Sequence, residues 1–172
     1  MGHKKAAQVM PTAMFSFSLP QWVEGLIQNG AGSYLTDESR MHLVIELTAR
    51  NVKNGTGGPF GAAVFQETTG RVVGAGVNSV VASRCSHAHA EMVALAGAQQ
   101  FLGSHDLSAT GVRHELVSSC EPCAMCLGAV AWSGVTKLVC GARDEDARAI
   151  GFDEGPKFKD WFLPWRLEGS RS

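Results

Sequence analysis

The sequence lacks an excess of charge of either sign. Its 15 lysines and arginines are matched by 16 aspartates and glutamates, which leaves a formal net charge of −1. Proteins that bind nucleic acid usually carry a basic excess that neutralises the phosphates. A near-neutral chain can still carry a local basic patch, but the charge balance disfavours nucleic acid as a partner.

Long hydrophobic runs are also missing. No stretch approaches the roughly 20 apolar residues that a membrane-spanning helix needs, so no membrane partner is expected. The lysine-containing start, Met1–Ala7, is not followed by a sustained apolar segment, because Pro11 and Pro20 interrupt it. A secretory leader is therefore not indicated, and the sequence predicts a soluble, cytoplasmic protein.

The cysteines cannot all be paired in disulfides within the chain, because there are five of them. In the reducing compartment expected here, metal binding is favoured over a disulfide framework. Cys123 and Cys126 form a Cys-x-x-Cys pair, which alone could be a redox pair or half of a structural zinc site. The remaining three, Cys85, Cys120 and Cys140, are expected to be small residues of the core or of a pocket wall.

Repeats, linkers and low-complexity segments are absent, and 172 residues are enough for one domain with a hydrophobic core. Hydrophobic periodicity predicts helices over 36–54, 89–101, 122–133 and 145–150, and strands over 60–65, 72–77, 114–118 and 137–140. Their order, α-β-β-α-β-α-β-α, favours an α/β fold, with three α/β/α layers and a mixed central sheet.

The chain is expected to divide into three parts. Residues 1–35 show no clear periodicity and are predicted to form an N-terminal arm, with a short turn around Trp22–Ile27. Residues 36–150 are predicted to form the catalytic domain. Residues 151–172, rich in glycine, proline and aromatic residues, are predicted to form a separate C-terminal segment.

A possible metal site is formed by His89 together with Cys123 and Cys126. Two cysteines three positions apart at the start of a helix present both sulfurs on one side, as a tetrahedral metal requires. Pro122 suits the first position of such a helix, and the positive helix end favours the thiolate form that binds metal. With His89 as a nitrogen ligand, three protein groups would hold Zn²⁺ and leave one position open, which is typical of a catalytic zinc.

Glu91 stands two residues after the histidine ligand and is predicted to lie near a zinc-bound water. Zinc lowers the pKa of that water to roughly 7. A nearby carboxylate can then take its proton and return it to a ring nitrogen and to departing ammonia. His-x-Glu followed by Pro-Cys-x-x-Cys is the signature of the zinc deaminases. A structural zinc site would need a fourth ligand, from Cys85, Cys120, Cys140 or His87, and would give no reason for a glutamate at this position.

On these residues the chain resembles the cytidine deaminase-like superfamily, over about Asp37 to Trp161. Three stretches resemble the guanine deaminase family more closely, in particular the bacterial enzymes that also accept ammeline. They are Gly58–Ala62 (GPFGA), Ser118–Cys126 (SSCEPCAMC) and Ala149–Pro156 (AIGFDEGP). The resemblance implies a cytidine deaminase-like fold and one zinc ion per subunit. It also implies a homodimer whose subunits exchange their C-terminal segments.

The same resemblance implies roles for further residues. Asn78 would hydrogen-bond the base, Phe60 would stack on it, and Glu154 would contact the substrate and act as a second proton shuttle beside Glu91. Ala90, between His89 and Glu91, would border the substrate. Without the resemblance, Asn78 would be interpreted as a turn residue, Phe60 as a core aromatic and Glu154 as a loop acid.

The predicted function is therefore zinc-dependent deamination of a nucleobase, most simply guanine to xanthine and ammonia, with ammeline or another triazine as a further substrate class. Deaminases acting on adenosine in tRNA share the same two motifs and form the main alternative, followed by deaminases of guanosine and cytosine. A zinc-stabilised binding protein without activity is the alternative outside the enzymes. Purine breakdown is the metabolic setting that guanine as substrate would imply.

Overall fold

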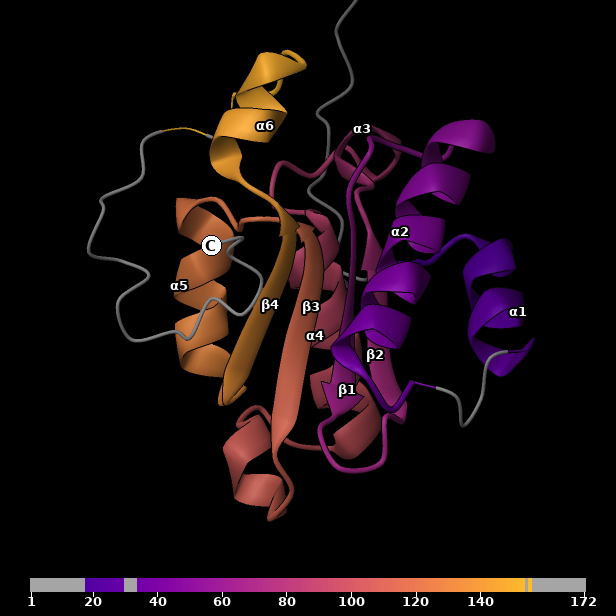
Figure 1. Ribbon diagram of the computed structural model, residues 1–172. Coiled ribbons are helices and arrows are strands. Elements are labelled where there is room, and N and C mark those ends of the chain that lie inside the picture. The colour runs from indigo at the N-terminus through magenta and orange to yellow at the C-terminus, as the bar shows by residue number, and fades with distance from the viewer. Residues whose placement is uncertain (1–17, 30–33, 154, 156–172) are drawn as a thin grey trace, which may run out of the picture.

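The computed structural model describes residues 18–29, 34–153 and 155 as a four-stranded sheet covered by helices (Figure 1). The helices are α1 (Gln21–Asn29), α2 (Asp37–Lys53), α3 (Val80–Ser83), α4 (Ala90–Leu102), α5 (Ala124–Ser133) and α6 (Asp144–Ala149), with a 3₁₀ helix η1 (Leu107–Thr110). The strands are β1 (Gly61–Gln66), β2 (Val72–Val77), β3 (His114–Cys120) and β4 (Lys137–Ala142). No helix in these ranges has both the length and the apolar character needed to cross a bilayer.

The strands lie in the order β2-β1-β3-β4. β1 is antiparallel to both β2 and β3, whereas β3 and β4 are parallel, so the sheet is mixed as predicted. The first two strands form an antiparallel hairpin, with Gly61 paired to Val77 and Phe65 to Val72. Val73 has no partner in this register, because the pairing shifts between Val64 and Phe65.

Helices cover both faces of the sheet, which confirms the three predicted layers. Successive residues of β1 alternate between two buried apolar clusters, since side chains of a strand point alternately to opposite faces. Ala62 and Val64 belong to the cluster formed with α4 and α5, while Ala63 and Phe65 belong to the one formed with α1 and α2. Figure 1 shows α5 on one side of the sheet and α1 and α2 on the other.

Helix α4 lies unusually close to β2, because two glycines leave room for its backbone. A Cβ atom on Gly74 would lie 2.3 Å from the carbonyl oxygen of Ala94, and one on Gly76 would lie 2.1 Å from that of Ala90. Any side chain at either position would therefore push the helix away. The contact fixes the start of α4 against the end of β2, where the predicted site residues lie.

The N-terminal part differs from the sequence prediction. In place of a short turn, residues 21–29 form a helix whose Val23 is fully buried in the cluster beneath α2. Trp22, Leu26 and Ile27 pack against the same cluster. The spacing of Val23, Leu26 and Ile27 is that of one helix face, but a pattern of nine residues is too short to stand out among nearby prolines and glycines.

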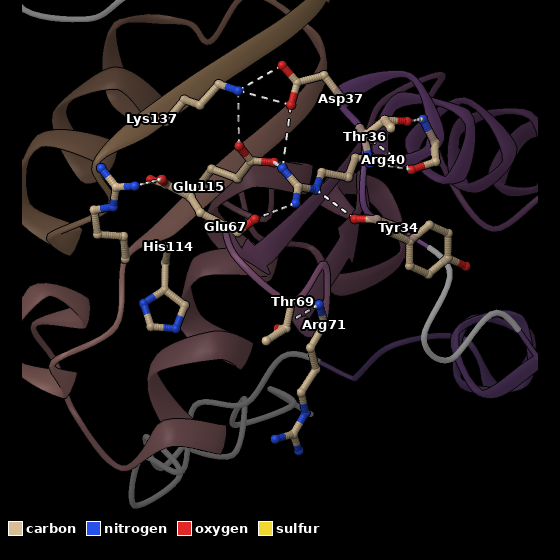
Figure 2. A network of polar contacts seen from close by, with 12 residues as sticks. Tyr34, Thr36, Asp37, Arg40, Glu67, Thr69, Arg71, His114, Glu115 and Lys137 are labelled. Carbon is tan, nitrogen blue, oxygen red and sulfur yellow. Dashed lines mark hydrogen bonds and ion pairs between the residues drawn. The ribbon is translucent and has the colours of Figure 1, made fainter.

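A network of charged side chains, with Arg40 and Glu115 buried within it, joins the starts of β3 and β4 to the start of α2 (Figure 2). Arg40 donates to Glu115 at 2.7 Å, and these side chains are only 4% and 0% exposed. Lys137 contacts Glu115 at 3.4 Å and Asp37 at 2.7 Å. Arg40 also donates to the backbone carbonyls of Tyr34 and Glu67. Burial raises the pKa of Glu115, and the two cations oppose that effect.

Replacing Arg40 by methionine should lower the free energy of unfolding by roughly 3 kcal/mol, because it leaves the buried Glu115 carboxylate without its shorter ion pair. The double variant Arg40→Met, Glu115→Leu should recover most of that loss, since the buried negative charge is then gone. Urea unfolding of the wild type and both variants measures this. A loss below about 1 kcal/mol in the single variant, the range of exposed pairs, would contradict it.

Candidate active site

A small pocket lies at the edge of the sheet where β1 begins and the other strands end. The registers require this arrangement: Gly61 at the start of β1 pairs with Val77 at the end of β2, and Ala62 pairs with Ser118 near the end of β3. β4 runs parallel to β3 and ends at the same edge. Helices α4 and α5 follow β2 and β3 in the chain and both begin here, so their positive N-terminal ends face one place.

The three predicted metal ligands come together at these two helix starts. His89 is the N-cap residue of α4, Cys123 is that of α5, and Cys126 lies on the first turn of α5. Their ligand atoms all lie within 4.8 Å of one another, and Cys123 Sγ is 3.8 Å from His89 Nδ1. Bonds of about 2.3 Å to sulfur and about 2.0 Å to nitrogen place the ligands of a tetrahedral zinc roughly 3.5 to 4 Å apart. The 3.8 Å between Cys123 Sγ and His89 Nδ1 therefore fits a bound zinc ion.

The chemistry of the two sulfurs agrees with a metal site. A hydrogen bond from Cys126 lowers the pKa of Cys123 to about 4. The same hydrogen bond, together with burial, raises the pKa of Cys126. The protein alone thus favours one thiolate beside one thiol, and a divalent cation supplies the positive charge that favours two thiolates.

A fourth protein ligand is not brought to this site by the described part of the chain, where the metal-binding group consists of the same three residues. Cys120 Sγ contacts the carbonyl oxygen of Arg143 at 3.6 Å, and Cys85 Sγ lies 3.3 Å from His87 Nδ1. Cys140 packs against the apolar cluster beneath α4 and α5. A zinc ion held by these three residues would keep one coordination position for water or substrate, as in catalytic zinc sites.

Glu91 lies beside the metal ligands with its side chain pointing into a buried space. It is 7% exposed, and burial raises its pKa. The hydroxyl of Ser118 donates to Glu91 Oε1 at 3.2 Å, and the thiol of Cys126 lies 3.5 Å from Oε2. A carboxyl group held in this way, with a raised pKa, can accept a proton and later return it.

The pocket above Glu91 contains every predicted substrate-contacting residue that the structure describes. Its lining consists of Phe60, Asn78, His89, Ala90, Glu91, Cys120 and Glu121. The placement is compatible with the roles predicted for Phe60, Asn78 and Ala90, which stay predictions. Glu121 had no predicted role, although it lies inside the Ser118–Cys126 stretch that carries the resemblance. Glu154, predicted as a second proton shuttle, lies outside the described residues.

Asn51 on α2 supports two walls of this pocket and was not anticipated. It is fully buried, and its Nδ2 donates to the carbonyl oxygens of Gly58 at 2.8 Å and Asn78 at 2.9 Å. Its Oδ1 accepts from Thr56 at 2.7 Å. The backbone N–H of Phe60 donates to Gly58, and that of Asn78 donates to Phe60. The buried side chain of Asn51 therefore joins the segment that carries Phe60 to the segment that carries Asn78.

Comparison with known proteins supports a deaminase site. A family model for the cytidine and deoxycytidylate deaminase zinc-binding region matches residues 35–142. A guanine deaminase of Bacillus subtilis is 34% identical over 126 residues, which cover 73% of this chain and 77% of that protein.

Solved structures point the same way. The structure of guanine deaminase from Nitrosomonas europaea superposes with a TM-score of 0.82 at 47% identity, covering 91% of this chain and 85% of that one. A protein variant in complex with 8-azaguanine superposes with a TM-score of 0.80 at 46% identity, covering 91% and 84%. A tRNA-specific adenosine deaminase of Buchnera aphidicola is 38% identical, but over only 55% of this chain and 58% of that protein.

Replacing Cys126 by serine should reduce bound zinc from about one ion per chain to a small fraction of that, because it removes one of three ligands. Cys85→Ser is the matched control, since this cysteine contacts His87 away from the ligand group. Measuring the zinc content of each variant by plasma mass spectrometry after gel filtration tests this prediction. Retention of zinc by Cys126→Ser, or its loss in Cys85→Ser, would contradict the assignment.

Proposed function

Since the chain belongs to the cytidine and deoxycytidylate deaminase family, we propose that it hydrolyses guanine to xanthine and ammonia with the help of one zinc ion. One observation carries the proposal. A buried carboxyl group, Glu91, lies beside a three-ligand zinc site, beneath a pocket whose other walls include an aromatic ring and a carboxamide. Hydrolytic removal of an amino group from a flat ring needs each of these parts.

Zinc held by His89, Cys123 and Cys126 supplies a Lewis acid that lowers the pKa of a coordinated water to roughly 7. Glu91 takes a proton from the attacking water and delivers it to the neighbouring ring nitrogen, while a C–O bond forms at the carbon that bears the amino group. Glu91 then passes the second proton to the amino nitrogen, the C–N bond breaks, and ammonia leaves. Its contact with Ser118 keeps the carboxyl group aimed at the same place throughout.

Two residues orient the base in the pocket. The carboxamide of Asn78 offers one donor group and one acceptor on a single plane, which suits the mixed edge of a purine. Phe60 offers an aromatic ring on which a flat base can stack. Ala90, between a metal ligand and Glu91, has no side chain beyond Cβ and leaves room for the ring above the metal site.

Glu154 is proposed as a second proton shuttle on the strength of the Ala149–Pro156 motif. A second carboxylate is useful where the substrate has several N–H groups and protons must reach two positions. Ammeline, a triazine with an amino group in a similar setting, is proposed as a further substrate.

Deamination of adenosine in tRNA is the second candidate. The tRNA-specific adenosine deaminases support it, but they match over 49–67% of the chain, whereas the guanine deaminases match over 73–91% of it. The balanced charge also disfavours an RNA partner. Deamination of guanosine or cytosine, and zinc-stabilised binding without catalysis, are further alternatives, which the same assay separates.

The biological setting is proposed from the residues and the resemblance. Five free cysteines suit the reducing cytoplasm, and guanine as substrate suits purine breakdown. We propose residues 36–150 as the catalytic domain, 1–35 as an N-terminal arm whose α1 packs on it, and 151–172 as a C-terminal segment exchanged within a homodimer.

A homodimer is supported by the outer face of α5. Met125 and Trp132, two turns apart on that helix, are 39% and 88% exposed. Large apolar side chains exposed on one face of a helix often mark an interface.

Ammonia release from guanine, ammeline, guanosine, adenine, cytosine and a tRNA anticodon stem-loop tests the proposed function. We expect turnover of guanine, and activity on adenine, cytosine or the stem-loop alone would overturn the substrate assignment. Glu91→Gln should lower kcat by at least about 100-fold while zinc content stays unchanged, because it removes the proton-transfer group. The control, Glu46→Gln on the exposed face of α2, should match the wild type. Unchanged turnover in Glu91→Gln would exclude the mechanism.

Replacing Trp132 by glutamate should convert the dimer to a monomer, because it places a charge in the proposed interface. Ile45→Glu is the control, since Ile45 is also exposed, at 52%, but lies on α2. Sedimentation equilibrium of the three proteins gives the masses. A monomeric wild type, or a dimer unaffected by Trp132→Glu, would refute the interface.

A further inference from the structure

The chain after α6 returns to the pocket and contacts its aromatic wall. The ring of Phe152 lies edge-on to that of Phe60, with the centroids 5.2 Å apart and the planes at 88°. Phe60 lines the pocket, whereas Phe152 supports it from the side and is 36% exposed. Edge-to-face pairs of this kind are worth about 0.5–1.5 kcal/mol, so Phe152 restricts the orientation of Phe60.

The Arg148 side chain ties this returning segment to α6, in addition to the backbone N–H groups of Gly151 and Phe152, which donate to the carbonyl oxygens of Arg148 and Ala147. Arg148 Nε donates to Asp144 at 2.7 Å, Nη1 donates to Asp153 at 2.7 Å, and Nη2 donates to the carbonyl oxygen of Gly155 at 2.6 Å. The backbone N–H of Gly155 in turn donates to Asp153 Oδ1 at 2.9 Å. The planar guanidinium satisfies three acceptors at once, and two of them belong to the segment that carries Phe152.

The start of α6 is itself attached to the pocket. The backbone N–H of Asp144 donates to Glu121 Oε2 at 3.0 Å, and Glu121 is one of the lining residues. The route from Glu121 through α6 and Arg148 to Phe152 therefore begins and ends at the pocket. It links the ring of Phe60, which stands just before β1, with the loop after β3 that carries Cys123.

We propose that Arg148 is a positioning residue for the deaminase reaction: it holds the Phe152 segment so that Phe152 fixes the Phe60 ring on which the base stacks. The inference rests on the proposed function, since it takes Phe60 as the stacking wall. Arg148 does not touch the reacting atoms, so its effect is on substrate binding more than on the chemical step.

The alternative is that Arg148 belongs to an ordinary exposed ion pair. The chain offers a matched example: Arg50 donates to Glu46 at 2.6 Å, also four residues apart on a helix. The arginine side chains are similarly exposed, at 41% for Arg148 and 44% for Arg50. Such pairs contribute little by themselves. The difference between the two is that Arg148 also holds Asp153 and Gly155.

Steady-state kinetics with guanine compares Arg148→Ala, Phe152→Ala and the control Arg50→Ala. Both Arg148→Ala and Phe152→Ala should raise KM by about two- to tenfold, the range of one aromatic pair, with a smaller change in kcat and the same zinc content. Arg50→Ala should match the wild type. The double variant Arg148→Ala, Phe152→Ala should be no worse than the poorer single variant, because both act through one contact.

A conservative variant separates positioning from charge. Arg148→Lys keeps the positive charge but cannot reach three acceptors with one ammonium group, so it should behave like the alanine variant. Full rescue by lysine would overturn the proposal, as would an Arg148→Ala protein whose KM equals that of Arg50→Ala.

Hydrogen–deuterium exchange of the peptide covering residues 149–155 tests the same contact without substrate. Exchange should be faster in Arg148→Ala than in the wild type and in Arg50→Ala. Unchanged exchange overturns the positioning role whatever the enzyme acts on. A wild type that does not release ammonia from guanine defeats the proposed function, and faster exchange in that case shows that the contact itself exists without a stacking role.

Discussion

The close packing of α4 on β2 is the constraint from which the site follows. Gly74 and Gly76 carry no side chains, so the backbone of the helix approaches the sheet directly. A helix held at that distance has little freedom to slide or tilt, and its first residues are fixed relative to the strand ends. His89 and Glu91 are those first residues. The geometry of the metal site thus depends on the absence of two Cβ atoms on the neighbouring strand, at Gly74 and Gly76.

The start of α5 supplies the remaining metal ligands in a similar way. Cys123 caps α5 just as His89 caps α4, and each residue has an extended backbone that turns its side chain away from its own helix. A ligand at an N-cap position lies at the positive end of the helix, which favours the anionic forms of sulfur and carboxylate. Two such ends meet at one sheet edge, where a hydrogen bond from Cys126 lowers the pKa of Cys123 and burial raises the pKa of Glu91.

The features that could be predicted from the sequence are those that a short stretch of residues encodes. The two members of the Cys-x-x-Cys pair, like those of the His-x-Glu pair, lie within one helical turn, so their spacing predicted the chemistry. The strands could be predicted from their hydrophobic pattern. Contacts between distant segments had no such signal. Asn51 appeared as one more polar residue near a helix end, yet its amide joins Gly58 to Asn78. The contact of Phe152 with Phe60 depends on how a loop returns, which periodicity does not encode.

The buried carboxyl groups at the two ends of the sheet have different kinds of partner. At one end the positive charges of Arg40 and Lys137 offset the buried negative charge of Glu115. At the other end the hydrogen-bond partners of Glu91 are a hydroxyl and a thiol, and burial raises the pKa of its carboxyl group. Active sites commonly sacrifice folding stability for such groups. Because the ionic end is separate in space, changes selected there for heat tolerance need not alter turnover, and an evolving or engineered enzyme can adjust the two properties independently.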